Sequence, residues 1–258
     1  MSETVLELRD VTKRFEGREG ETVVAVDGVS FSVEAGSCVG LVGESGCGKS
    51  TIVQMACGLE PVSSGSILVA GRGVDARRSA GLGRRAGRRG PSEVQMVFQQ
   101  AQASFDPRRT LGDGVCEPLR IAGESAMRAR KRATELFASC GLAEDLLDRY
   151  PNEASGGQCQ RAAIARALAC DPRLIVCDEP TSALDVTVQA QVLDLLRDVR
   201  AASGVAYLFI CHDLALVQGF CERVLVMRRG KIVEEGATDE VLRRPKHPYT
   251  RDLIRASM

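Results

Sequence analysis

Two stretches of the chain carry residue types that bind phosphate, and they lie far apart in the sequence. The first reads Gly43-Glu-Ser-Gly-Cys-Gly-Lys-Ser-Thr51, after the apolar run 39–42 and before a helical pattern over 51–59. In this context the glycines let successive N–H groups wrap the β- and γ-phosphates of a nucleotide. Lys49 supplies a mobile cation, and Ser50 offers its hydroxyl to Mg²⁺. The predicted nucleotide-binding residues of this loop are Gly43, Glu44, Ser45, Gly46, Cys47, Gly48, Lys49, Ser50 and Thr51.

The second phosphate-binding stretch reads Glu153-Ala-Ser-Gly-Gly-Gln-Cys-Gln160. A hydroxyl residue and two glycines open a predicted helix here, and free N–H groups at the positive end of a helix attract anions. The loop at 43–51 is the stronger of the two signals. The sequence therefore raises the question of why one chain carries both.

A third stretch, Leu174-Ile-Val-Cys-Asp-Glu179, is an apolar strand that ends in two carboxylates. Two carboxylates at the tip of a buried strand are costly to desolvate unless a cation or a water network receives them. In a chain with a phosphate-binding loop, Asp178 is expected to bind Mg²⁺ directly or through water. Glu179 is expected to polarise the water that attacks the γ-phosphate. The alternative is a solvated strand end without a catalytic role.

The composition is that of a globular protein of 258 residues, enough for one large domain or two small ones. Its 34 basic and 34 acidic residues give a net charge of zero, so the whole molecule shows no bias towards nucleic acid. The charged N-terminus lacks a signal-peptide pattern and no apolar run is long enough to cross a bilayer, which predicts a cytoplasmic chain. The ten cysteines include no Cys-x-x-Cys pair, so we expect buried reduced thiols rather than a zinc or iron–sulfur site.

The order of the predicted elements places these stretches on an α/β scaffold. Strand patterns dominate the first part, at residues 4–9, 23–26, 29–34, 38–42, 66–70 and 94–98. The pattern over 110–150 is helical, with an amphipathic stretch at 124–140. Then helices at 156–169 and 186–202 alternate with strands at 174–178 and 206–211, before a short helix and two strands around Arg229-Gly230. This alternation predicts a mostly parallel sheet covered by helices.

One segment, residues 71–90, is rich in glycine and has seven arginines against a single acid, Asp75. Such a composition is typical of an exposed, solvated loop. A contact with lipid headgroups or nucleic acid is the alternative.

Six motifs in one order make the chain similar to the ATP-binding subunits of ABC transporters. They are Walker A at 43–51, a Q-loop at Val97-Phe-Gln99, the signature at Ala154-Ser-Gly-Gly-Gln158, Walker B at 174–178 with Glu179, a D-loop at Ser182-Ala-Leu-Asp185 and a switch histidine, His212. The resemblance implies a P-loop NTPase core with a mostly parallel sheet, an N-terminal antiparallel β subdomain and a helical insertion. It also implies a single ABC ATPase domain over 1–258, with the nucleotide-binding core at 1–98 and 155–258, the Q-loop and helical subdomain at 99–154, and a C-terminal tail at 245–258.

The resemblance also implies roles for single residues. Gln99 would reach Mg²⁺ and the attacking water, and His212 would contact the γ-phosphate, so the expected catalytic residues are Glu179, Gln99 and His212. Their alternatives are a polar strand end for Gln99 and a structural histidine for His212. The expected Mg²⁺ ligands are Ser50, Gln99 and Asp178.

Two more residues are expected at the nucleotide on the same grounds. Phe15 would stack on adenine, although a core aromatic residue would give the same pattern, and Asp185 of the D-loop would contribute to the site.

The resemblance answers the question of the two phosphate-binding stretches. Subunits of this family pair head to tail, so that the signature of one closes over the ATP held by Walker A of the other. Ser155, Gly156, Gly157 and Gln158 are therefore expected to contact a partner's ATP, where a helix end supplies donors to the γ-phosphate. The partner is expected to be a second copy of this chain or a related ATPase subunit.

Further stretches narrow the resemblance to ATPases of dipeptide, oligopeptide and nickel importers. They are Gln95-Met-Val-Phe-Gln99, Phe105-Asp-Pro-Arg108, Thr187-Val-Gln-Ala190 and the tail His247-Pro-Tyr-Thr-Arg-Asp-Leu253. The resemblance implies an ATPase that energises import through separate membrane permease subunits and an extracytoplasmic binding protein, from the cytoplasmic face of the inner membrane. The signature departs from the family, with Ala154 in place of Leu and Cys159 in place of Arg. The alternative function is a soluble ABC-type ATPase that acts on nucleic acid or within a soluble enzyme complex.

Overall fold

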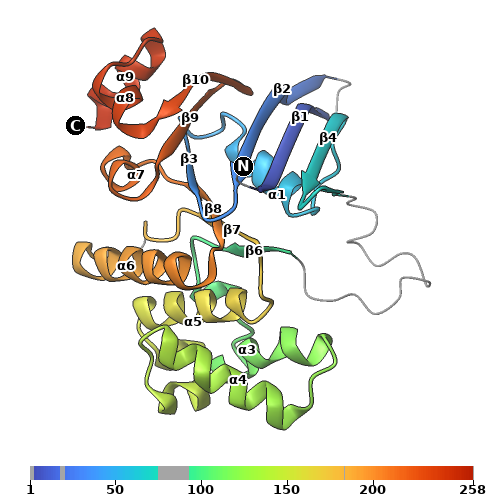
Figure 1. Cartoon of the computed structure of the whole chain (residues 1–258), viewed down its shortest axis with the longest axis vertical. Helices are drawn as coiled ribbons and strands as arrows, with labels where there is room; N and C mark the ends of the chain where they lie inside the picture. The colour runs from blue at the N-terminus through green and yellow to red at the C-terminus, as the bar shows by residue number, and fades with distance from the viewer. Residues whose placement is uncertain (1–2, 18–20, 75–92, 183, 258) are drawn as a thin grey trace. The chain divides into compact units, whose positions relative to one another are not determined.

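A computed structural model describes residues 3–17, 21–74, 93–182 and 184–257 (Figure 1). Most of the arginine-rich segment predicted as an exposed loop, residues 75–90, lies outside the described residues. The chain divides into two compact units, Met1–Arg84 with Val205–Met258, and Arg85–Gly204. The predicted subdomain boundaries at 98 and 154 differ from this division and stay a prediction.

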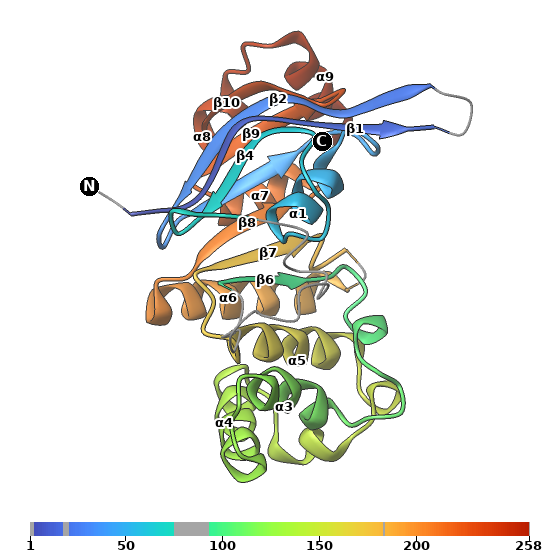
Figure 2. The same ribbon diagram turned by 90° about the vertical axis from the view of Figure 1, so that its right-hand side faces the viewer.

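The first unit begins with an antiparallel sheet, as the sequence predicts. Its strands are β1 (Thr4–Glu16), β2 (Thr22–Glu34), β4 (Ser64–Val69) and β5 (Arg72–Gly73), in the order β2-β1-β4-β5. Figure 2 shows the first three of these side by side. The predicted strands at 23–26 and 29–34 are one strand. The register of β1 and β2 shifts at several points, and Gly28 takes a positive φ of 62°, so bulges absorb the break in the pattern.

The second sheet of this unit carries the phosphate-binding loop. Strand β3 (Cys38–Val42) runs parallel to both β8 (Ala206–Ile210) and β9 (Arg223–Arg228), and β10 (Lys231–Ala237) returns antiparallel to β9. Every residue of β3 and β8 is buried, so these apolar runs form the core. The turn into β10 uses Arg229 and Gly230 at φ of 46° and 81°. The helices of the unit are α1 (Lys49–Ala56), α7 (Leu214–Phe220), α8 (Thr238–Arg243) and α9 (Pro248–Ser257).

The second unit joins a parallel strand pair to a helical layer. Strands β6 (Val94–Val97) and β7 (Leu174–Asp178) run parallel. The helices are α3 (Leu111–Ile121), α4 (Ala126–Ser139), α5 (Gly156–Leu168) and α6 (Val186–Ser203), with 3-10 turns at Gln102–Ser104, Glu144–Asp148 and Pro151–Glu153. Helices α3 and α4 pack against each other and against α5 (Figure 2), so the helical pattern over 110–150 is confirmed.

The ten cysteines are free thiols, and all but Cys57 are buried. Burial raises the pKa of the Cys140 thiol to about 11, which keeps this side chain protonated at neutral pH. These thiols behave as small apolar core residues. Among the residues that the structure describes, no helix combines the length and apolar character needed to cross a bilayer.

Candidate functional site

The loop between β3 and α1 depends on glycines at two positions. A Cβ on Gly43, whose φ is 152°, would collide with the carbonyl oxygen of Met227. A Cβ on Gly48, whose φ is 114°, would collide with the carbonyl oxygen of Ala25. Gly46 has open space at its side-chain position, and its φ of 78° is a left-handed conformation that favours glycine. Two glycines are therefore required by the packing of the loop, and the third keeps one face of the loop accessible.

Lys49 lies folded against this loop and is only 8% exposed. Its Nζ donates to the carbonyl oxygens of Gly43 at 2.7 Å and Glu44 at 2.8 Å. Helix α1 begins at Lys49 with no side-chain cap from Gly48, so the N–H groups of its first turn have no partner within the helix. Uncapped N–H groups beside a lysine ammonium fit the phosphates of a nucleotide.

Gln99 and Glu179 meet where β6 and β7 end. The parallel pairing, from Val94 opposite Leu174 onward, aligns the carboxyl ends of the two strands. Gln99 Nε2 donates to Glu179 Oε2 at 3.0 Å, so two predicted catalytic residues are in contact. Glu179 has a φ of 47°, a left-handed conformation that is unfavourable for a residue with a Cβ and that concentrates at functional sites.

Asp178 is the last residue of β7 and is half-buried. Its carboxylate suits a hard cation such as Mg²⁺. Gln99 uses Nε2 in its bond to Glu179, so Oε1 is the atom with which it would bind the same ion. Both predicted ligands of this unit therefore carry suitable oxygen atoms.

The signature stretch begins α5 with a reciprocal capping box. Ser155 Oγ accepts from the N–H of Gln158 at 3.3 Å, and Gln158 Oε1 accepts from the N–H of Ser155 at 2.9 Å. Ser155 and Gln158, which are predicted to contact a partner's ATP, thus also cap the N-terminus of α5. Because the Ser155 hydroxyl accepts in the box, its own proton is still available for a phosphate oxygen.

The two signature glycines have different surroundings. Gly156 is exposed, and a Cβ there would meet Leu184 Cδ2 at an ordinary 3.4 Å. Gly157 is buried, and a Cβ there would lie 2.6 Å from Val188 Cγ1 of α6. The absence of a side chain at 157 is thus explained by helix packing, whereas at 156 it leaves an exposed surface open.

The two unusual signature residues are also placed differently. Ala154 is half-buried, so an alanine in place of leucine removes less packing here than it would at a fully buried position. Cys159 is fully buried, and its thiol donates to the carbonyl oxygen of Pro151 at 3.4 Å. Neither residue interrupts the capping box.

The remaining three predicted residues lie on or beside three different elements. Asp185 caps α6, because its Oδ1 accepts from the N–H of Val188 at 3.0 Å. His212 is exposed shortly after β8 in the first unit. Phe15 is 38% exposed, and Lys13 Nζ lies 4.8 Å from its ring centroid. Phe15 is therefore not a fully buried core residue, and its stacking on adenine stays a prediction.

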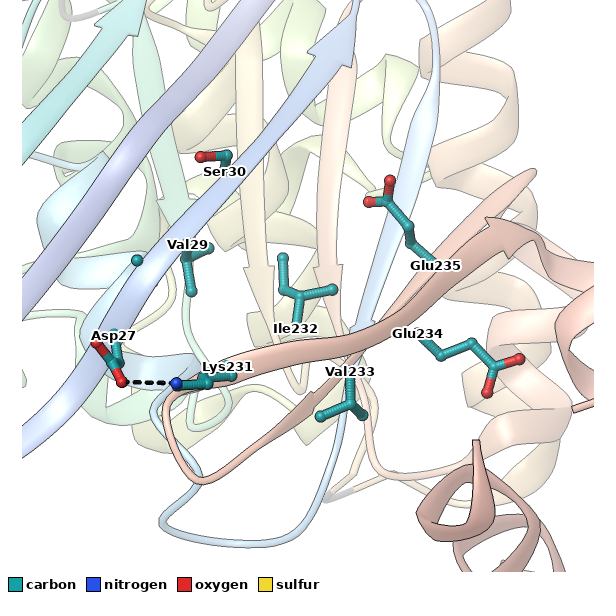
Figure 3. A pocket seen from close by; sticks show the side chains of 9 residues that line it. Asp27, Val29, Ser30, Lys231, Ile232, Val233, Glu234 and Glu235 are labelled. Carbon is teal, nitrogen blue, oxygen red and sulfur yellow. Dashed lines mark ion pairs between the residues drawn. The ribbon is translucent and has the colours of Figure 1, made fainter. Parts of the chain in front are cut away.

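Two hollows lie on the described surface, and they differ in whether predicted site residues line them. A groove of about 610 Å³ runs between β2 and β10 (Figure 3), and none of its residues was predicted to act at the site. The ion pair of Asp27 and Lys231 lies at one end of its lining residues. A smaller hollow of about 270 Å³ in the second unit is lined by Gln99, Gly156 and their neighbours. Only the smaller hollow contains predicted residues.

One contact of the phosphate-binding loop escaped prediction. Tyr249, in the tail used above only to narrow the family, accepts a hydrogen bond from the backbone N–H of Glu44 at 3.0 Å. The sequence marks Tyr249 only as part of the tail motif. Nothing in that motif indicates a contact with Glu44, which lies 205 residues earlier in the chain.

Comparison with known proteins gives a consistent result. The family described as "ABC transporter" matches residues 26–182. The oligopeptide transport ATP-binding protein OppF of Salmonella typhimurium is 43% identical over 98% of this chain and 77% of its own length. The di/tripeptide transport ATP-binding protein DppF of Pseudomonas aeruginosa is 43% identical over 99% of this chain and 79% of its own. A solved dimeric ATP-binding cassette, bound to ADP and Pi in a post-hydrolysis state, has a TM-score of 0.77 at 30% identity and covers 90% of this chain and 98% of its own. The chain belongs to the ABC transporter family and is an ATPase of that family.

Proposed function

We propose that this ATPase energises the import of peptides through separate membrane permease subunits. The observation that carries the proposal is the 43% identity to an oligopeptide transport ATP-binding protein over 98% of the chain. Relatives from Pseudomonas aeruginosa and Bacillus subtilis carry the names of di/tripeptide and oligopeptide transport proteins. None of these three names refers to nickel, nucleic acid or a soluble enzyme, so peptides are the proposed cargo.

In the proposed cycle the loop at 43–51 holds the phosphates of ATP. Lys49 leaves the loop carbonyls and turns to the β- and γ-phosphates, while the first N–H groups of α1 donate to them. Ser50, Asp178 and Gln99 would hold Mg²⁺, which neutralises phosphate charge when bound. Phe15 offers an exposed ring face to adenine.

Hydrolysis is assigned to Glu179 as the base that takes a proton from the attacking water. Gln99 donates to Glu179 Oε2, so the two side chains would act together on the attacking water. His212 would contact the γ-phosphate, and Asp185 would contribute to the site from the start of α6.

The signature is proposed to complete the site of a second subunit. The exposed Gly156 lets a phosphate approach the start of α5, and Ser155 has a hydroxyl proton to donate. ATP then lies between Walker A of one subunit and the signature of the other, and removal of the γ-phosphate releases them. The second subunit is another copy or a related ATPase, and the solved dimeric cassettes support such pairing.

The remaining partners follow from the import function. Permease subunits would dock near Gln99 on the Q-loop and helical subdomain, and an extracytoplasmic protein would deliver the peptide. The chain would then act as a peripheral protein at the cytoplasmic face of the inner membrane.

Uptake and purification together test this proposal. Cells that carry Lys49→Ala should lose ATP-dependent uptake of labelled di- or oligopeptides and keep uptake of Ni²⁺, whereas the reverse pattern would assign the nickel class. Purification of Glu179→Gln with ATP from detergent-solubilised membranes should recover membrane-spanning partners. Recovery of nucleic acid or soluble enzymes instead would support the soluble ATPase.

A further inference from the structure

The C-terminal tail reaches the phosphate-binding loop through one buried tyrosine. Tyr249 lies at the start of α9 and is 3% exposed. Its hydroxyl accepts a hydrogen bond from the N–H of Glu44 at 3.0 Å. Burial raises the pKa of Tyr249, although the bond from Glu44 acts in the opposite direction, so the hydroxyl is neutral at physiological pH.

The same residue of the loop is held on its other side by Lys49. Lys49 Nζ donates to the carbonyl oxygen of Glu44 at 2.8 Å and to that of Gly43 at 2.7 Å. Both backbone polar groups of Glu44 are therefore engaged, the N–H by the tail and the carbonyl by Lys49 and, at 3.3 Å, by the N–H of Cys47 within the loop. When Lys49 turns to a phosphate, the bond to Tyr249 and the bond within the loop persist.

Tyr249 can hold the loop because the tail itself is fixed at several points. The Glu234 carboxylate accepts from the N–H groups of Lys246 at 2.7 Å and His247 at 3.0 Å. His247 Nδ1 accepts from the N–H of Tyr249 at 3.2 Å, and the Arg228 guanidinium lies 4.7 Å from the Tyr249 ring centroid. Glu234 also lines the groove between β2 and β10, and in Figure 3 its side chain extends away from the Asp27–Lys231 ion pair.

We propose that Tyr249 is a positioning residue for ATP, which holds the Glu44 peptide so that the phosphate-binding loop keeps its shape when Lys49 moves to the nucleotide. This inference rests on the proposed role of the loop at 43–51 in binding ATP. A loop held in its binding shape loses less conformational freedom when the ligand arrives, so the bond increases affinity without touching the reacting atoms. By reciprocity, bound nucleotide stabilises the tail.

Tyr249→Phe tests this role, because it removes the hydroxyl and keeps the buried ring. One neutral hydrogen bond corresponds to roughly a two- to tenfold effect on an equilibrium constant. The Kd and KM for Mg-ATP should rise by about that factor, with kcat at saturating ATP unchanged. Hydrogen exchange of the Glu44 amide should also become faster in the nucleotide-free protein, because this amide loses its acceptor. This readout distinguishes loss of the hydrogen bond from a general loosening of the tail.

Two matched variants serve as controls. Tyr150→Phe removes a hydroxyl from a 43% exposed tyrosine of the second unit and should leave the Kd unchanged. Ile254→Ala shortens a buried side chain of α9. It should lower the melting temperature and leave the Kd close to its wild-type value.

The proposal is overturned if Tyr249→Phe leaves both the Kd and the Glu44 exchange rate at their wild-type values. It is also overturned if Ile254→Ala weakens ATP binding as much as Tyr249→Phe does, because tail packing would then suffice. Lys49→Ala separates this failure from failure of the site itself. If Lys49→Ala binds ATP normally, the loop at 43–51 is not the nucleotide site.

Discussion

Gly157→Ala asks whether the second signature glycine serves packing or phosphate. The new Cβ would lie 2.6 Å from Val188 Cγ1, whereas ordinary contact begins at 3.4 Å. Overpacking of this kind costs about 1–3 kcal/mol, and the better helix propensity of alanine offsets about 0.5–1 kcal/mol of it. We therefore expect the free energy of unfolding to fall by roughly 1 kcal/mol, and by about 2.5 kcal/mol at most, with the melting temperature falling by about 2–4 °C per kcal/mol.

A double variant and a neighbouring variant make this prediction specific. Adding Val188→Ala removes Cγ1 and leaves Val188 Cβ at 3.8 Å, so urea unfolding should show that the two substitutions compensate each other. Gly156→Ala has no such clash and should keep its stability, but its methyl group should lower ATPase activity at the exposed helix start. Equal stability of wild type and Gly157→Ala, or strict additivity in the double variant, would refute the packing explanation.

Three other predictions concern the tail, the signature and the adenine contact. Although burial alone would raise the pKa of Glu234, hydrogen bonds from the N–H groups of Lys246 and His247 lower it below its ordinary value. Ionised Glu234 therefore stabilises the folded state at neutral pH, and this contribution is lost as pH falls through the lowered pKa. Glu234→Gln should thus be less stable than wild type at pH 7, and the gap in urea unfolding should narrow as the solution becomes acidic; a gap independent of pH would contradict this. Ala154→Leu should change ATP turnover only modestly, and complete loss would show that its packing has been misjudged. Phe15→Ala should weaken ATP binding in a nucleotide titration while the free energy of unfolding stays within about 0.5 kcal/mol, because the ring is exposed; unchanged affinity would remove Phe15 from the adenine site.

Local patterns were enough to predict much of this fold. The apolar run before Gly43, the loop glycines and the helix after them lie next to one another, so one short window contains the whole strand–loop–helix unit. The pattern predicted two strands on either side of Gly28, whereas the structure has one strand that continues through an irregular register at this glycine.

Contacts between distant segments were beyond sequence reasoning. The bond from Gln99 to Glu179 depends on the parallel register of β6 and β7, and neither residue reveals that register. Gly157 has a packing reason that becomes visible only once α6 places Val188 against α5. Tyr249 reaches Glu44 only because the tail folds back to the loop.

The most direct test of the account is ATP hydrolysis by Glu179→Gln. Glutamine preserves the size of the side chain but cannot take a proton from water, so binding of Mg-ATP should persist while turnover falls by about a hundredfold or more. Light scattering of the same sample should show a dimer that forms with ATP and persists, because the γ-phosphate that joins the two subunits is not removed. Hydrolysis at the wild-type rate would contradict the assignment of Glu179 as the catalytic base.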